Sequence, residues 1–285
     1  MNKMEKGIVN KIIKFSNVDG PGNRMAIFFQ GCNLNCLSCH NPETIGLCSN
    51  CGNCIKICPE KALKKDINKK IKWNSELCIE CDMCIKNCPS GASSRVKLYT
   101  VEDLIFEIEK VKSFIKGITV SGGECSLQPE FIAELFLQVK KRFPKLTCFV
   151  DTNGKEDFTQ VKYKNFVDLT DKFMLDIKAW DEDEHIKLTG FTNKNIIKNL
   201  FYLKELDKLF EVRTVVIPEF LNNKMTIENV SKIIQDKNIR YKIIKYRKLG
   251  VRKENLIGIN SPTKDELEFL EEICKENHVK DIVII

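Results

Sequence analysis

Three cysteines lie close together after an apolar run, in the segment FFQGCNLNCLSCHNPET at residues 28–44. Cys32, Cys36 and Cys39 follow the spacing C-x3-C-x2-C. Thiolates spaced in this way bind zinc or an iron–sulfur cluster. A structural zinc site takes four protein ligands. A cubane cluster held by three cysteines leaves one iron open to a small molecule that carries an amine and a carboxylate. The three-thiol set therefore raises the question of what that open iron binds.

A second group of cysteines forms an internal repeat. Residues 47–63 and 77–93 each read C-x2-C-x2-C-x3-C-P, the run of two-cluster bacterial ferredoxins, in which the fourth cysteine binds the other cluster. On that rule one [4Fe–4S] cluster takes Cys48, Cys51, Cys54 and Cys88, and the other takes Cys78, Cys81, Cys84 and Cys58. A pair of four-thiolate zinc sites is the alternative. The repeat predicts a ferredoxin-like domain at residues 46–96, inserted after the first strand of the main domain.

The main domain, residues 1–45 and 97–285, alternates strands with helices. We expect strands within residues 25–31, 117–124, 146–154, 173–180, 210–218 and 240–250. We expect helices at residues 100–114, 129–143, 195–209 and 226–237, and a last helix that opens at Ser261-Pro262. Thr100 and Asp103 have the spacing of a capping box. About six βα units predict a parallel sheet in a partial, (β/α)6 TIM-like barrel.

The other residues with chemical potential follow the ends of these strands. They are Gly122, Gly123 and Glu124, the run from Asp151 to Gly154, the run from Asp176 to Lys178, and Arg247. Active sites of parallel barrels lie at that rim, so we expect these motifs to form one site with the three cysteines. Taken alone, each motif is equally an ordinary capped turn.

Composition narrows the function classes. The 285 residues include 14 cysteines but 3 histidines, which suits thiolate metal chemistry in a reducing compartment. No apolar run approaches the ~18 residues of a membrane span, and the N-terminus lacks a signal-peptide pattern, so we expect a cytoplasmic protein without membrane contact. The net charge of +7 is spread among alternating lysines and acids, which does not predict nucleic-acid binding.

The cluster loop together with the glycine motif resembles the radical S-adenosylmethionine (SAM) superfamily. VDGPGNR at residues 18–24, GCNLNCLSCHNPET at 31–44, SGGE at 121–124 and DTNG at 151–154 resemble the motifs of glycyl-radical-enzyme activases. The ferredoxin repeat is similar to that of the subgroup with two extra [4Fe–4S] clusters, and the short opening motif is most similar to YjjW-type activases. The resemblance implies a radical SAM barrel that cleaves SAM to methionine and a 5′-deoxyadenosyl radical, which removes hydrogen from a glycine of a partner enzyme.

The resemblance also implies roles for individual residues. The SAM-binding set is Ser38, His40, Asn41, Gly122, Gly123, Glu124, Asp151, Asp176, Lys178, Arg213 and Arg247. A monovalent cation, Na⁺ or K⁺, is implied at Asp151, Thr152, Met174 and Asp176. Asp19, Gly20, Gly22 and Arg24 are implied to dock the partner's glycine loop. Ser38 departs from the pattern because the family often has an aromatic residue there, and Arg247 stands where formate-lyase activases have a histidine.

Several expectations follow for cofactors and partners. The chain is expected to be a monomer with three [4Fe–4S] clusters and SAM, and to receive electrons from ferredoxin or flavodoxin in an anaerobic setting. The extra clusters either relay those electrons or shape the partner interface. Two other readings stay open: a radical SAM enzyme that acts on a small molecule or another peptide, and a non-enzymatic electron carrier or zinc-binding interaction protein. The sequence does not name the partner.

Overall fold

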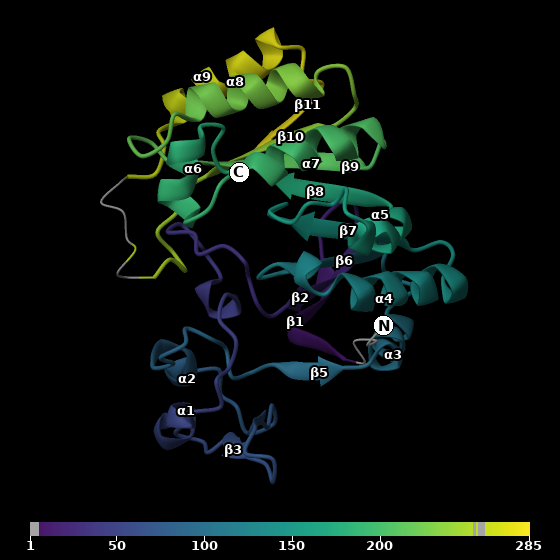
Figure 1. Cartoon of the computed structure of the whole chain (residues 1–285), viewed down its shortest axis with the longest axis vertical. Coiled ribbons are helices and arrows are strands. Elements are labelled where there is room, and N and C mark those ends of the chain that lie inside the picture. The colour runs from purple at the N-terminus through teal and green to yellow at the C-terminus, as the bar shows by residue number, and fades with distance from the viewer. Residues whose placement is uncertain (1–5, 253–254, 256–259) are drawn as a thin grey trace. The chain divides into compact units, whose positions relative to one another are not determined.

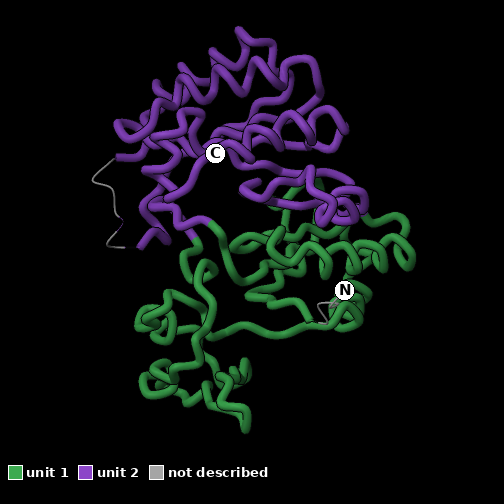
Figure 2. Tube along the Cα trace, in the orientation of Figure 1, with its two compact units in different colours: residues 1–33, 41–146 green, residues 34–40, 147–285 purple. Residues whose placement is uncertain are grey.

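The computed structural model describes residues 6–252, 255 and 260–285. The chain divides into two compact units (Figure 2). Unit 1 comprises residues 1–33 and 41–146, and unit 2 comprises residues 34–40 and 147–285. The cysteine repeat lies within unit 1, and the cluster loop passes from unit 1 into unit 2 between Asn33 and Leu34. Within the described residues, no helix has the length and apolar character of a bilayer span.

Unit 1 contains a sheet with the strand order β6-β2-β1-β5 (Figure 1). Strands β2 and β6 are parallel, and β1 runs antiparallel to both β2 and β5. The elements of unit 1 are β1 (Gly7–Ser16), β2 (Arg24–Phe29), α1 (Asn53–Ile57), β3 (Leu63–Lys65), β4 (Ile71–Trp73), α2 (Met83–Lys86), β5 (Lys97–Tyr99), α3 (Val101–Glu109), β6 (Gly117–Gly122) and α4 (Pro129–Arg142). Strands β3 and β4 form a separate antiparallel hairpin.

Unit 2 contains a parallel sheet in the order β11-β10-β9-β8-β7. Its elements are β7 (Thr147–Thr152), α5 (Lys164–Leu169), β8 (Lys172–Asp176), α6 (Glu182–Thr189), α7 (Lys194–Glu205), β9 (Leu209–Val216), α8 (Asn223–Ile234), β10 (Arg240–Lys245), α9 (Lys264–Glu276) and β11 (Asp281–Ile284). The parallel βα alternation predicted from the sequence is confirmed.

Fully buried apolar side chains form the hydrophobic core of each unit. In β2, Met25 and Ile27 have no exposed surface, and Phe29 packs edge-on against Phe131 of α4 with ring centroids 6.0 Å apart. In unit 2, Phe158 packs against Phe166 and other aromatic side chains beside β8. These cores hold strand ends in place, and the strand ends carry the residues that the sequence singles out.

Helix caps explain where the helices begin. The predicted capping box of Thr100 and Asp103 is present at the start of α3. The predicted start of the last helix at Ser261-Pro262 is wrong, because a capping box of Thr263 and Glu266 begins α9 two residues later. Strands β1, β5 and β11 were not predicted.

Candidate functional site

The cluster loop begins in unit 1 with backbone hydrogen bonds. Gly31 N donates to Thr44 O at 2.8 Å, and Cys32 N donates to Ile45 O at 3.0 Å, so the two sides of the loop are paired at its base. The side chain of Gln30, which is 3% exposed, reaches across this base. Its amide nitrogen donates to Glu43 O at 2.8 Å and to Gly46 O at 2.6 Å. This buried amide stabilises the backbone at residues 43–46, where the chain leaves the main domain and enters the cysteine repeat. The sequence analysis did not single out Gln30.

The predicted glycine motif lies against the same base. Gly123 N donates to Phe29 O at 2.9 Å, and Glu124 N donates to Gly31 O at 2.7 Å. A Cβ at Gly123 would lie 2.3 Å from Gly31 O, so only glycine fits this close approach of two backbones. The buried Glu124 carboxylate accepts from Ser126 N at 3.0 Å, which caps the short turn that follows. Glu124 therefore braces this loop in the structure.

The second part of the cluster loop, residues 34–40, belongs to unit 2. Asn35 N donates to Thr189 O at 3.1 Å, and Leu37 N donates to Leu188 O at 2.9 Å, at the end of α6. Leu37 also packs against a buried apolar cluster that contains Leu188. His40 makes a 2.9 Å hydrogen bond through Nε2 to Arg247 O, so two of the predicted cofactor-binding residues contact each other.

Two charged groups at the end of β8, Asp176 and Lys178, interact electrostatically with the loop cysteines of unit 2. Lys178 Nζ forms a 2.9 Å ion pair with the Asp176 carboxylate. Burial opposes the charged form of Lys178, but Asp176 and the Cys36 and Cys39 thiols outweigh it and raise the pKa of this lysine. Burial raises the pKa of the Cys36 thiol, while Lys178 acts in the opposite direction. Lys178 is thus a positive charge within electrostatic range of Cys36 and Cys39.

A buried ion network on β7, β8 and β9 collects the predicted cation ligands. Arg213 Nη1 lies 2.9 Å from the Asp151 carboxylate, and Nη2 lies 3.0 Å from Met174 Sδ. Arg213 also pairs with Glu211, a 1% exposed carboxylate that the sequence analysis missed. Burial opposes the charge of Arg213, but Asp151 and Glu211 outweigh it and raise the pKa. The guanidinium therefore contacts two of the four residues predicted to hold a monovalent cation.

The predicted partner-docking residues divide into two kinds. Gly20 and Gly22 adopt φ values of +121° and +70°, and Gly22 is exposed in the turn before β2. Arg24 is fully buried, so its prediction as part of a docking surface is corrected: a side chain with no exposed area cannot touch a partner. Its Nε donates to Thr119 Oγ1 at 2.8 Å, and Thr119 Oγ1 donates to Asp19 O at 2.5 Å. Arg24 therefore supports the turn from beneath.

The two cysteine repeats have matching backbones. Asn50 and Glu80, at equivalent positions, have φ values of +58° and +55°, and the equivalent Gly52 and Asp82 are both left-handed before the short helices α1 and α2. This agreement extends the sequence repeat to the structure. Four cysteines of one predicted ligand set line a single cavity; they are Cys58, Cys78, Cys81 and Cys84. Of the other set, Cys54 lies within electrostatic range of Cys48 and Cys51, and also of Cys84 from the first set.

The donor chemistry of these cysteine sets is compatible with iron–sulfur clusters. All of the cysteines between residues 32 and 88 are free thiols. A cubane binds its thiolates at separate corners, so four cysteines around a cavity are compatible with it.

Cys125 is fully buried in the turn after Glu124, where it packs as an apolar side chain.

His185 is a further buried residue that sequence reasoning left without a role. It lies on α6, and Nδ1 is 2.6 Å from Phe191 O. Burial lowers the pKa of this imidazole. Because Thr189 at the end of the same helix accepts the hydrogen bond from Asn35, His185 helps to fix the turn on which the cluster loop rests.

Comparisons with known proteins identify the family of this chain. Residues 26–230 match the model of the radical SAM superfamily. The chain is 33% identical to the trans-4-hydroxy-L-proline dehydratase activating enzyme of Clostridioides difficile, over 95% of this chain and 97% of that protein. It is 28% identical to a putative glycyl-radical enzyme activating enzyme of Haemophilus influenzae, over 97% of this chain and 96% of that protein. It is also 29% identical to the pyruvate formate-lyase-activating enzyme of Staphylococcus aureus, over 92% of this chain and 90% of that protein.

Solved structures share the fold at low sequence identity. QueE from Escherichia coli superposes with a TM-score of 0.56 at 12% identity, over 98% of this chain and 94% of that chain. Streptococcus suis SuiB superposes with a TM-score of 0.58 at 11% identity, over 90% of this chain and 47% of that chain. The family match and these likenesses confirm the prediction of an α/β fold with the TIM-like radical SAM architecture.

Proposed function

The chain belongs to the radical SAM superfamily, and from this premise we propose which of its residues serve the cluster, SAM and the partner. The protein is an enzyme that activates a glycyl radical enzyme. The observation that carries this function is the 28–33% identity to activating enzymes over at least 92% of the chain.

The proposed cluster ligands are Cys32, Cys36 and Cys39. When bound, a reduced [4Fe–4S] cluster supplies the electron that cleaves SAM to methionine and a 5′-deoxyadenosyl radical. The backbone pairing of Gly31 with Thr44 and of Asn35 with Thr189 holds the two arms of the loop. Lys178 places a positive charge beside two of the thiols, which favours their thiolate form.

We propose that two groups of residues bind SAM. Gly122 and Gly123 lie against the backbone of Phe29 and Gly31 at the base of the cluster loop, and the family resemblance supports them as SAM contacts. Lys178 and Arg213 are the cations available to the SAM carboxylate in unit 2. The remaining proposed contacts are Ser38, His40, Asn41, Glu124, Asp151, Asp176 and Arg247, by the family resemblance.

The cysteine repeat is proposed to hold two further [4Fe–4S] clusters that relay electrons inward. The ligand sets are Cys48, Cys51, Cys54 and Cys88, and Cys78, Cys81, Cys84 and Cys58. The shared cavity of the second set and the matching backbones of the two repeats support this assignment. The donor is proposed to be ferredoxin or flavodoxin.

Two finer assignments complete the proposal. A monovalent cation is proposed at Asp151, Thr152, Met174 and Asp176, where its oxygen ligands suit a hard ion. Because Arg213 contacts the same carboxylate, the cation competes with a guanidinium there. The turn from Asp19 to Gly22, beside the 74% exposed Val18, is proposed to receive the partner's glycine loop.

The test is anaerobic. Reconstituted protein is given SAM and titanium(III) citrate, and 5′-deoxyadenosine is measured; a candidate glycyl radical enzyme is then added and the electron paramagnetic resonance doublet of a glycyl radical is sought. The Cys36→Ala protein should form neither product, whereas Cys274→Ala, in the core against Ser231, should form both. Wild-type protein that contains iron and releases no 5′-deoxyadenosine contradicts the proposal.

A further inference from the structure

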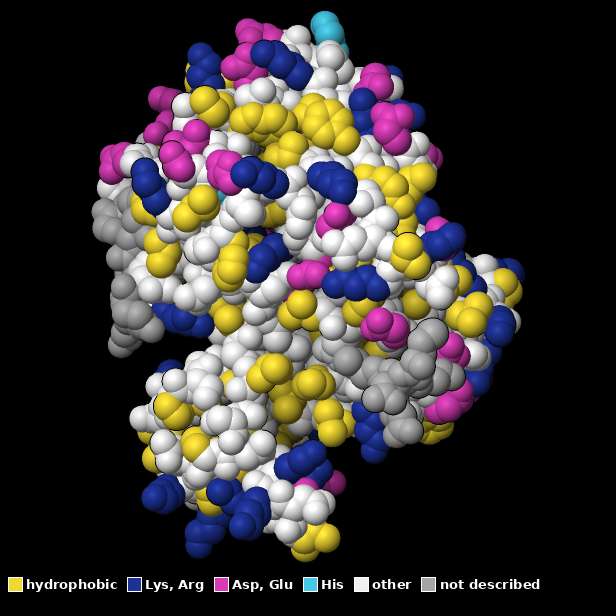
Figure 3. Space-filling view, viewed as in Figure 1, with side chains coloured by type: hydrophobic (Ala, Val, Ile, Leu, Met, Phe, Trp, Pro, Cys, Tyr) yellow, Lys and Arg dark blue, Asp and Glu magenta, His cyan; other side chains and the backbone are white. Residues whose placement is uncertain are grey.

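The hairpin of β3 and β4 concentrates positive charge on unit 1. Residues 61–73, here called the basic hairpin, carry six lysines and one acid, a net charge of +5 in a chain whose total is +7. All six lysines are exposed; they are Lys61, Lys64, Lys65, Lys69, Lys70 and Lys72. Figure 3 shows dark-blue side chains gathered at the end of the molecule where Figure 1 labels β3. Charge of one sign on a short element favours a partner of the opposite sign.

The arrangement of these lysines works against the hairpin's own stability. Lys64 and Lys72 are directly opposite each other across the two strands. Like charges at such positions destabilise strand pairing. Asp66 lies 3.7 Å from Lys72 and offsets part of this repulsion. Ile67, at the turn, is 97% exposed, so the tip of the basic hairpin presents an apolar side chain between lysines.

The basic hairpin is joined to the loop that carries the first cysteines of the repeat. Ile71 N donates to Asn50 Oδ1 at 2.8 Å, and Lys65 Nζ lies 3.4 Å from Cys51 O. Cys51 itself is exposed. The positive surface therefore borders the proposed ligands of one ferredoxin-type cluster directly.

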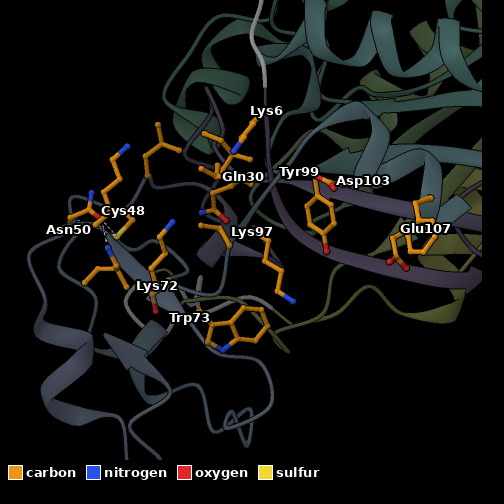
Figure 4. Close-up of a pocket in the computed structure, with 18 residues that line it drawn as sticks. Lys6, Gln30, Cys48, Asn50, Lys72, Trp73, Lys97, Tyr99, Asp103 and Glu107 are labelled. Carbon is orange, nitrogen blue, oxygen red and sulfur yellow. Dashed lines mark hydrogen bonds between the residues drawn. The ribbon is translucent and has the colours of Figure 1, made fainter. Parts of the chain in front are cut away.

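A groove continues this surface along the edge of the sheet. It has a volume of about 730 Å³ and includes Cys48, Lys72 and Trp73 together with Lys97 of β5 (Figure 4). Lys97 Nζ lies 5.2 Å from the centre of the Trp73 ring. The groove offers a partner both ammonium groups and an aromatic surface next to the same cysteine loop.

We propose that the basic hairpin is the docking surface for an acidic one-electron carrier protein, and that electrons enter at the cluster of Cys48, Cys51, Cys54 and Cys88. This rests on the proposed function of the repeat. In each transfer the carrier loses one electron and the cluster gains one, with no bond made or broken. Charge complementarity identifies the class of partner, because the net +5 of the basic hairpin attracts an acidic protein, and electrostatic steering accelerates the weak, short-lived encounters typical of electron transfer.

The experiment uses fully reconstituted protein and reduced flavodoxin as the probe. The variant Lys64→Glu/Lys70→Glu lowers the net charge from +7 to +3, and the control Lys145→Glu/Lys280→Glu lowers it equally at exposed positions outside the hairpin. Stopped-flow absorbance gives the second-order rate of flavodoxin oxidation at several salt concentrations. At low salt we expect the rate to fall about tenfold or more for the hairpin variant and less than about twofold for the control. The difference should shrink as salt rises.

Three outcomes overturn the docking proposal without touching the proposed function. Equal rates in both variants mean that the carrier binds elsewhere. An equal loss of rate with titanium(III) citrate means that the lysines balance the charge of the cluster. Normal flavodoxin oxidation with impaired activation of the partner enzyme means that the hairpin serves that enzyme. Absence of 5′-deoxyadenosine from wild-type protein with titanium(III) citrate would instead reject the proposed function.

Discussion

Gly123 offers the sharpest test of how the cluster loop is built. In Gly123→Ala the added Cβ lies 2.3 Å from Gly31 O and 2.7 Å from Thr44 O. Ordinary contact begins near 3.4 Å, so these backbones must separate by about 1 Å. Separation weakens the hydrogen bonds of Glu124 N to Gly31 O and of Gly31 N to Thr44 O. At about 1 kcal/mol for each bond and about 1 kcal/mol or more for overpacking, we expect a loss of about 3 kcal/mol in the free energy of unfolding.

The assay is the midpoint of thermal unfolding of anaerobically reconstituted protein, together with the affinity for SAM. A loss of this size lowers the midpoint by roughly 5–10 °C for a chain of this length. Gly190→Ala is the matched control, because Gly190 has a φ of +84° but nothing within 4 Å of an added Cβ. Backbone strain alone should cost it about 1 kcal/mol. If Gly123→Ala melts no lower than Gly190→Ala and binds SAM normally, the close approach of the two backbones does not hold the loop.

Three further outcomes are expected. Lys178→Met, which removes the ion pair with Asp176, should weaken SAM binding roughly 10- to 100-fold by equilibrium titration of the protein that carries its cluster. Arg24→Lys should raise the partner concentration needed for half-maximal radical formation, measured by electron paramagnetic resonance, because a lysine cannot reproduce both hydrogen bonds beneath the Asp19 turn. Burial lowers the pKa of His185, so as the pH falls the unfolded chain takes up this proton before the folded protein does. The contribution of neutral His185 to the free energy of unfolding is therefore present above about pH 6.5 and is lost as the pH falls below that value. His185→Gln should flatten this pH dependence in denaturant titrations.

The parallel βα elements could be predicted from the sequence, because the strands are apolar runs and the helices have apolar residues at helical spacing. Strands β6 to β10 and helices α3, α4, α7 and α8 fall where expected. The elements that were missed have weak local signals: β5 is three residues long, and β1 is recognised only by its pairing with β2 and β5. The start of α9 was misplaced because Ser261-Pro262 imitates a cap, while the reciprocal bonds between Thr263 and Glu266 decide the boundary.

A sequence motif signals candidate site residues in a single sequence, whereas residues that act through tertiary pairing give no such signal. The spacing of the cysteines and the Gly122–Glu124 motif carries a chemical meaning that a single sequence displays. Gln30 and Glu211 have no such signal, because each acts through partners distant in the chain, at Gly46 and Lys242 among others. The burial of Arg24 was equally hidden, since the motif that contains it reads as a surface turn.

A network of buried ion pairs positions Arg213 near the proposed SAM-binding residues. Glu211, which is 1% exposed, is paired with Arg213 and lies 3.2 Å from Lys242 Nζ. A buried carboxylate needs such partners, and the same partners hold the guanidinium in place. Arg213 is thereby directed at Asp151, 2.9 Å away, and at Met174. Because Glu211 pairs with Arg213 and is not itself a proposed ligand, removing Glu211 should free the guanidinium without deleting any proposed ligand. Glu211 therefore helps to set the position of Arg213, and with it the room for the proposed cation beside Asp151, although Glu211 is not one of the residues proposed to bind that cation.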